Sequence, residues 1–206
     1  MKVYDISMEI RNDMMVYKNQ EQRRPSLEQT RYIQADGVNE STLHINLHTG
    51  THMDANWHVL ENGSTIEEID LAKCITPCKV LDFTHVNNCI TREDLMTKEI
   101  QKDDFILLKT RNSFTDDFDF GYVYLSSDGA EYLQNIGIKG VGIDSLGIER
   151  NQAGHPTHRA LLSKNIVILE GLRLKDIKEG KYILCAPPLK IKGADGSPVR
   201  ACLVEL

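Results

Sequence analysis

Short apolar runs alternate with polar segments along most of the 206 residues. Several of these runs are apolar at nearly every position, which is typical of strands that are buried on both faces of a sheet. The runs predict strands at 3–8, 41–47, 78–83, 105–110, 140–144, 166–169 and 182–186.

Between the apolar runs, polar and glycine positions predict where helices begin and end. Thr91 has an acidic residue, Asp94, three positions later, which is the pattern of a helix N-terminal capping box. Ser126 opens a second helical segment, and Gly137 is placed to end it. A short helix is predicted at 159–164. Strands and helices in alternation favour an α/β fold: a single domain over residues 1–206, with a mixed β-sheet and flanking helices.

Two further segments carry weaker patterns. The stretch 11–31 is polar and poorly patterned, and we interpret it as a loop or an arm. Near the C-terminus, the glycines and the Asp-Gly pair within 193–198 predict a turn. That turn would join the arms 189–192 and 199–204 of a closing β-hairpin.

The composition is that of a soluble globular protein, with 41% hydrophobic and 26% charged residues. No apolar run is long enough for a membrane span, and a net charge of −6 argues against binding to nucleic acid. The N-terminal residues lack the apolar core of a secretory signal, so the expected location is the cytoplasm. Five cysteines, an odd number, fit reduced thiols. The close pair Cys74 and Cys78 resembles a loop entering a strand more than a metal site.

One eleven-residue stretch holds three histidines, His48, His52 and His58, and the carboxylate of Asp54, in a chain with seven histidines. Imidazole and carboxylate together suit a divalent zinc, manganese or iron ion, whereas structural zinc sites rely more on cysteine. Any single histidine can be a hydrogen-bonded structural residue. The set favours a metal site, while His44, in the predicted strand before it, is interpreted as structural.

The spacing within this stretch restricts its geometry. On a helix His48 and His52 would share a face, but Asp54 would lie on nearly the opposite side. On a straight strand the three share a face, but His48 and Asp54 would be ~20 Å apart at ~3.3 Å per residue. The chain must therefore fold back, and Gly50 is the natural pivot because glycine tolerates positive φ. The segment 41–47 is then a strand that leads into a tight, ligand-bearing turn.

A second group of polar residues lies further along the chain. His158 follows the sequence His155-Pro156-Thr157, and Glu170 ends the predicted strand at 166–169. A carboxylate at the end of a buried strand can be a chance feature, but strand ends are where α/β folds place their sites.

These residues resemble the putative cyclase family of metal-dependent hydrolases, which includes the bacterial kynurenine formamidases (arylformamidases) and isatin hydrolase. The most specific part of the resemblance is the histidine-rich stretch, and the other parts follow it in the expected order over nearly the whole chain. The matching segments are 5–7, 48–58, 157–162, 168–172, 188–191 and 193–200.

The resemblance implies a fold of the swivelling β/β/α type, assembled as a homodimer or homotetramer. It also implies one or two divalent ions per subunit, Zn²⁺ or alternatively Mn²⁺. Carried over position by position, His48, His52 and Asp54 would hold a first ion.

In the same comparison, His158 and Glu170 would complete that site or hold a second ion. His58 would stay off the metal as general acid and base, since histidine exchanges protons near neutral pH. The implied activity is hydrolysis of a small amide, formamide or cyclic amide, with N-formylkynurenine as a candidate substrate. Alternatives are a metal-dependent cyclase or dehydratase, and a non-catalytic metal-binding protein.

The sequence departs from the family pattern at three places. Asn56 replaces a common proline, and Arg159 replaces a frequent histidine. The segment 14–19 stands where formamidases often carry Trp-Pro-Gly. Tyr17 and Trp57 could wall an aromatic pocket, although each could equally pack in the core or at a subunit interface.

Overall fold

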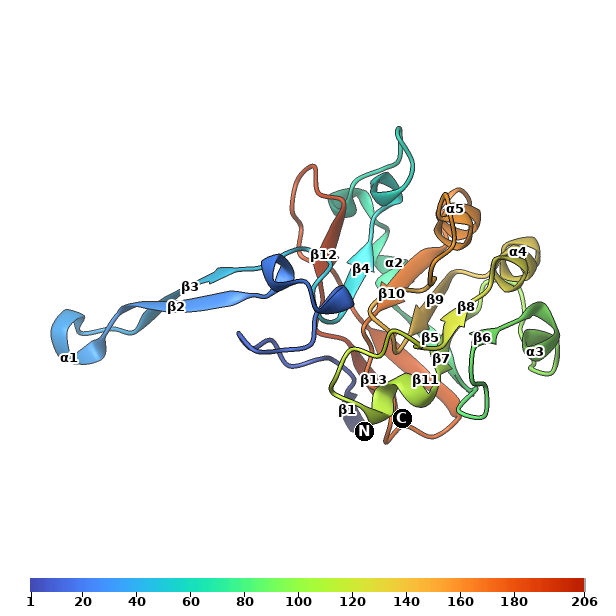
Figure 1. Cartoon of the computed structure of the whole chain (residues 1–206), viewed down its shortest axis with the longest axis horizontal. Coiled ribbons are helices and arrows are strands. Elements are labelled where there is room, and N and C mark those ends of the chain that lie inside the picture. Colours follow the sequence, from blue (N-terminus) through green and yellow to red (C-terminus); the bar gives the residue numbers. More distant parts are fainter. Residues whose placement is uncertain (206) are drawn as a thin grey trace.

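The computed structural model describes residues 1–205, whose central feature is a nine-stranded mixed sheet (Figure 1). The strands of this sheet are β1 (Lys2–Asp5), β4 (His52–Asp54), β5 (Ile75–Asp82), β7 (Phe105–Lys109), β9 (Gly140–Ile143), β10 (Val167–Glu170), β11 (Gly180–Cys185), β12 (Gly196–Pro198) and β13 (Cys202–Glu205). Their order is β1-β13-β11-β5-β7-β9-β10-β4-β12. The four central strands β5, β7, β9 and β10 are parallel, and the strands on either side join antiparallel.

The remaining elements are shorter. The helices are α1 (Ile33–Asp36), α2 (Leu71–Cys74), α3 (Arg92–Met96), α4 (Ser127–Ile136) and α5 (Pro156–Leu162). Two small sheets pair β2 (Ser26–Arg31) with β3 (Glu40–His44) and β6 (Cys89–Ile90) with β8 (Tyr124–Leu125). Single 3-10 turns lie at Tyr17–Asn19, Glu21–Arg23, Asn56–His58, Ile66–Glu68 and Arg111–Phe114.

Both faces of the central strands are buried, which explains why their sequences are apolar rather than alternating. In β7, Ile106 and Leu108 face a cluster that includes Leu133 of α4, on the side covered by α3, α4 and α5 (Figure 1). On the other face, one cluster contains both Met53 of β4 and Leu203 of β13, from opposite halves of the sheet. The sheet is therefore curled around this second cluster.

Most of the predicted elements are confirmed. The predicted strands at 78–83, 105–110, 140–144, 166–169 and 182–186 correspond to β5, β7, β9, β10 and β11, and β1 is shorter than the predicted 3–8. The Thr91–Asp94 capping box forms at α3, and Gly137 ends α4 with φ of 79°. The predicted helix at 159–164 is α5, which begins earlier because Pro156 occupies its first turn.

The segment that precedes the histidine-rich stretch differs from the prediction. The expected loop or arm at 11–31 ends in a strand, β2, and the expected strand at 41–47 is β3, which ends at His44. The two strands pair only with each other and extend away from the body of the molecule, with α1 at the tip (Figure 1). We call residues 26–44 the arm. Every residue of the arm is exposed, His44 included.

The predicted closing hairpin is wrong. Residues 189–192 form no strand, β12 pairs with β4, and β13 pairs with β1 and β11. The glycines within 193–198 favour a local turn, but the edge of β4 offers backbone hydrogen bonds to residues of the same segment. This long-range pairing overrides the local turn signal, and it places Asp195 beside the histidine-rich stretch.

All five cysteines are unpaired. Burial raises the pKa of Cys74 to about 11 and that of Cys78 to about 12, so both thiols are protonated at neutral pH. Within residues 1–205, no helix has the length and apolar character that a bilayer crossing requires.

Candidate metal centre

The histidine-rich stretch does fold back at Gly50. This glycine has φ of 70°, and the chain reverses before it continues into β4. Gly171, directly after β10, also has a positive φ, and a Cβ atom there would lie 2.2 Å from the carbonyl oxygen of Gly50. Gly171 is needed because the two backbone segments approach so closely, whereas Gly50 is favoured by its left-handed backbone conformation. The predicted pivot is confirmed.

Strand pairing brings three of the predicted ligands together. β4 and β10 are antiparallel, with His52 opposite Glu170, and Asp54 lies two residues along on the same face of β4. His52 Nε2 lies 3.2 Å from Glu170 Oε2 and 3.6 Å from Asp54 Oδ1. His52 Nδ1 donates to the carbonyl oxygen of Gly50 at 2.9 Å, which leaves Nε2 as the free nitrogen directed at the two carboxylates.

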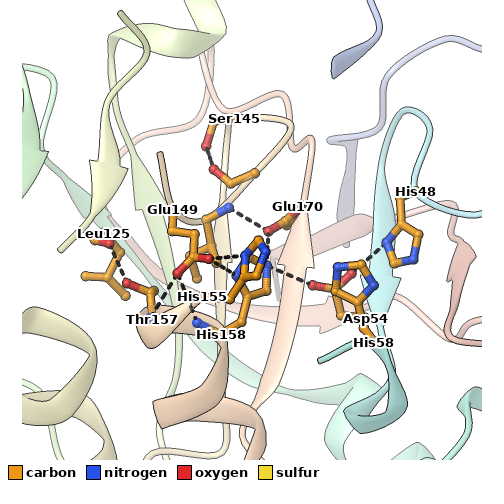
Figure 2. Close-up of polar contacts among 12 residues, drawn as sticks. His48, Asp54, His58, Leu125, Ser145, Glu149, His155, Thr157, His158 and Glu170 are labelled. Atoms are coloured by element: carbon orange, nitrogen blue, oxygen red, sulfur yellow. Dashed lines mark hydrogen bonds and ion pairs between the residues drawn. The ribbon is translucent and has the colours of Figure 1, made fainter. Parts of the chain in front are cut away.

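The other two predicted ligands approach the same carboxylates from different elements. His158, from α5, places Nε2 3.4 Å from Glu170 Oε1 and 3.6 Å from Asp54 Oδ2. His48, from the turn, places Nδ1 3.0 Å from Asp54 Oδ1. The structure thus brings all five predicted ligands together, with the three histidines arranged around the carboxylates of Asp54 and Glu170. Figure 2 labels four of the five.

The donor set fits a divalent cation. His52 Nε2 and Asp54 Oδ2 are buried and have no hydrogen-bond partner, a costly arrangement unless another group binds them. His52, Asp54 and Glu170 also offer ligand atoms that lie within 4.8 Å of one another. Two buried carboxylates with imidazole nitrogens beside them are the ligand types of zinc and manganese sites.

The carboxylates and imidazoles of this cluster shift one another's pKa values. Burial opposes ionisation of Glu170, but His158 and His52 outweigh it and hold the pKa of this carboxyl well below its usual range. Burial likewise opposes protonation of His48, yet Asp54 and Asp195 raise its pKa to about 9. The carboxylates are therefore ionised and able to bind a cation at neutral pH.

His58 lies next to His48 and His158 at the edge of the cluster. Its ring lies 4.1 Å from that of His48, at an interplanar angle of 36°, and 5.7 Å from that of His158, measured between ring centroids. Burial lowers the pKa of His58, and the neighbouring imidazoles lower it further. A neutral imidazole is a proton acceptor at physiological pH.

Two residues of the site were missed in the sequence analysis. Asp195 Oδ2 lies 2.9 Å from His48 Nε2 and 3.7 Å from His58 Nδ1, so it contacts both histidines. Glu149 Oε1 lies 3.1 Å from His158 Nδ1. Asp195 lies in the segment 193–200, which resembles the family but was interpreted only as a turn, and Glu149 belongs to no recognisable motif. The available signal for Glu149 was a carboxylate soon after the predicted strand at 140–144, because loops after parallel strands carry functional residues.

The cluster opens into a cavity of about 710 Å³. This volume is in the range of binding sites for small molecules. Tyr17 and Trp57 line the cavity, as do Arg23 and the exposed Arg159. The two aromatic residues therefore face the cavity beside the predicted ligands, which was one of the alternatives left open by the sequence.

Comparison with known proteins places this site in a family. A family model described as "Putative cyclase" matches residues 4–150. Kynurenine formamidase of Sphingopyxis alaskensis is 33% identical over 171 residues, which cover 82% of this chain and 82% of that protein. Kynurenine formamidase of Salinibacter ruber is 30% identical over 206 residues, covering 98% and 97%. A solved structure described as a potential metal-dependent hydrolase with cyclase activity has a TM-score of 0.91 at 47% identity, covering 98% and 96%.

The curled sheet and its buried cluster, with these relatives, define an enzyme of the metal-dependent amidohydrolase type. Within that class, the chain belongs to the putative cyclase family. The resemblance seen in the sequence and the α/β fold it implied are confirmed.

Proposed function

We propose that this protein hydrolyses a small amide, formamide or cyclic amide with a divalent metal ion held by His48, His52, Asp54, His158 and Glu170. The observation that carries the proposal is the buried, partly unpartnered ligand set at the floor of a cavity, with a further imidazole, His58, beside it. Relatives named kynurenine formamidase support the reaction class.

The protein side of the reaction follows from the placement of His58. When a divalent ion is bound, the chemistry it supplies is activation of water and polarisation of the substrate carbonyl group. His58 lines the cavity and is neutral at pH 7, so it can accept a proton as water attacks and return it to the leaving nitrogen. Asp195, near Nδ1 of His58, favours a proton on that atom and leaves Nε2 for the substrate.

The substrate is proposed from the shape and lining of the cavity. Tyr17 and Trp57 offer flat apolar faces for an aromatic ring, and N-formylkynurenine is an aryl formamide of suitable size. We also propose Zn²⁺ or Mn²⁺ as the metal, since the ligands are nitrogen and oxygen atoms, and the cytoplasm as the location, in keeping with five free thiols.

The function is tested by metal content and a substrate screen. Protein purified without added metal is expected to contain at least one zinc or manganese ion per chain by elemental analysis. The metal-loaded enzyme is then assayed on formamides, lactams and lactones. Activity on N-formylkynurenine alone selects the formamidase function, whereas absence of a stoichiometric divalent ion would refute the metal-dependent function.

The arm points to self-association. A two-stranded hairpin by itself is only marginally stable in water. The arm nevertheless exposes five large apolar side chains: Leu27, Tyr32, Ile33, Val38 and Leu43. Such side chains on a projecting element favour burial against another molecule. We therefore propose that the arm packs on a second copy of the chain in a homodimer or homotetramer.

Removing the tip of the arm is expected to dissociate this assembly. Deletion of residues 28–42, closed by two glycines, should yield a monomer in light scattering coupled to size-exclusion chromatography. Because the arm contains no buried residue, the monomer should keep the far-ultraviolet circular dichroism of a folded protein. A deletion variant that assembles like the wild-type protein would contradict this role of the arm.

A further inference from the structure

Glu149 is a buried carboxylate that contacts three residues at the start of one short helix, α5. It lies in the loop after β9 and is 5% exposed. Figure 2 shows it between Thr157 on one side and His155 and His158 on the other. All three of these residues belong to α5 or to its N-cap position.

One oxygen of Glu149 binds the backbone at the start of α5. Oε2 accepts hydrogen bonds from the backbone N–H groups of Thr157, at 2.9 Å, and His158, at 3.4 Å. The first helical residue, Pro156, has no N–H group, and the N-cap residue, His155, makes no side-chain capping bond. Glu149 therefore supplies the acceptor that the helix lacks at its own N-terminus.

The other oxygen binds imidazole groups. Oε1 lies 3.1 Å from His158 Nδ1 and also contacts Nδ1 of His155. The contact with His155 is a hydrogen bond, whereas the contact with His158 is at ion-pair distance without hydrogen-bond geometry. An ionised carboxylate only accepts, so its charge beside His158 Nδ1 favours a proton on that nitrogen. With the proton of His158 on Nδ1, its Nε2 is the free nitrogen, and Nε2 is the atom that faces Asp54 and Glu170.

His158 is thus held at two points by one side chain, at its backbone and at its ring. We propose that Glu149 is a positioning residue that fixes the ring orientation and tautomer of His158 for metal binding. The inference rests on the proposed function, since it assigns His158 to the metal.

Substitution by glutamine is the sharpest test of this role. Glutamine has nearly the same size but only one acceptor oxygen. If that oxygen faces the imidazoles, its NH₂ group faces the N–H groups of Thr157 and His158, and the reverse orientation directs NH₂ at the imidazoles. E149Q therefore cannot keep both sets of contacts.

The measurement is the metal dissociation constant of the purified protein, obtained with Zn²⁺ against a competing chelator and with Co²⁺ by its absorption spectrum. E149Q is expected to bind 10–100-fold more weakly, about the usual effect of losing the partner of a ligating histidine. H155N is the matched control. It removes the exposed neighbouring imidazole, and asparagine tolerates the left-handed backbone of this position, where φ is 54°. H155N should bind metal like the wild-type protein.

A double-mutant cycle separates positioning from general stability. In the H158A background, where no imidazole remains to be positioned, E149Q should cause little further loss of affinity. An equal loss in that background, or wild-type affinity and Co²⁺ spectrum for E149Q alone, would overturn the proposal. If E149Q fails to fold, E149D serves the same test, because its carboxylate is withdrawn by one methylene, and unchanged affinity there overturns it too. A wild-type protein that binds no metal would instead refute the proposed function.

Discussion

Replacement of Asp54 by asparagine is expected to abolish stoichiometric metal binding and, with it, hydrolysis. Asp54 is buried, and its two oxygens face His48, His52 and His158 at 3.0–3.6 Å. Asparagine keeps the shape but loses the negative charge and one acceptor. We expect metal affinity to fall by more than the ~100-fold that loss of a ligand's neighbour typically costs. Elemental analysis and chelator competition measure it.

The fold should survive this substitution. Burial and the charge of Glu170 oppose ionisation of Asp54, but His48 and His58 outweigh them and hold the pKa of this carboxyl below its usual value. A neutral side chain therefore removes the repulsion from Glu170 as well as the contacts with the histidines. D195N is a graded control, because Asp195 contacts the opposite nitrogen of His48 but is not a proposed ligand. D195N should weaken metal binding by no more than about 10–100-fold, the usual effect of losing a ligand's partner, and should keep stoichiometric metal. A D54N protein that still holds one metal ion per chain would show that Asp54 is not an essential ligand.

The second large effect is expected at His58. His58→Ala should leave the metal content unchanged and lower kcat by about 10²–10⁴-fold, the usual contribution of a general acid or base. The reason is that no ligand of the cluster is removed, whereas the imidazole placed to transfer protons is lost. Steady-state kinetics on the substrate found in the screen, with metal analysis of the same sample, gives both quantities.

His85→Ala is the control for this experiment, since His85 is exposed and lies outside the cavity lining. Two results would contradict the assignment of His58. Unchanged activity would favour a role without proton transfer, as in a non-catalytic metal-binding protein. Loss of the metal would make His58 a ligand, which its position permits, because His48, Asp54 and His58 offer ligand atoms within 4.8 Å of one another.

The local pattern was sufficient to predict the central strands and the turn of the candidate site. The segments around β7 and β10 are apolar at nearly every position because helices cover one face of the sheet and its own curl buries the other. The helix N-caps at Thr91 and Ser126 could be predicted because a capping side chain binds a backbone N–H group only three residues further along the chain. Gly50 was identified because the spacing of His48 and Asp54 permits neither a helix nor a straight strand.

Contacts between segments that are distant in the sequence could not be predicted from the pattern of apolar and polar residues. The predicted hairpin at the C-terminus failed because β12 pairs with β4, some 140 residues earlier in the chain. Strand β2 was not predicted within the expected loop or arm at 11–31, because β2 pairs only with β3 and has no buried face, so its sequence shows no clear alternation of apolar and polar positions. Asp195 and Glu149 were missed for the same kind of reason, since each meets its histidine only after distant segments come together.

The sequence by itself determined the type of chemistry: three histidines and an aspartate around a glycine pivot, with His158 and Glu170 recognised through the family resemblance. Only the tertiary structure decided which atoms meet. The β4–β10 register sets His52 opposite Glu170, and α5 directs His158 at Glu170 and Asp54. Glu149 contacts the other ring nitrogen of His158, and Asp195 contacts the other ring nitrogen of His48. The physical reason is that ligand types are properties of single residues, whereas the distances and free nitrogens of a metal centre depend on strand pairing and on hydrogen bonds between remote segments.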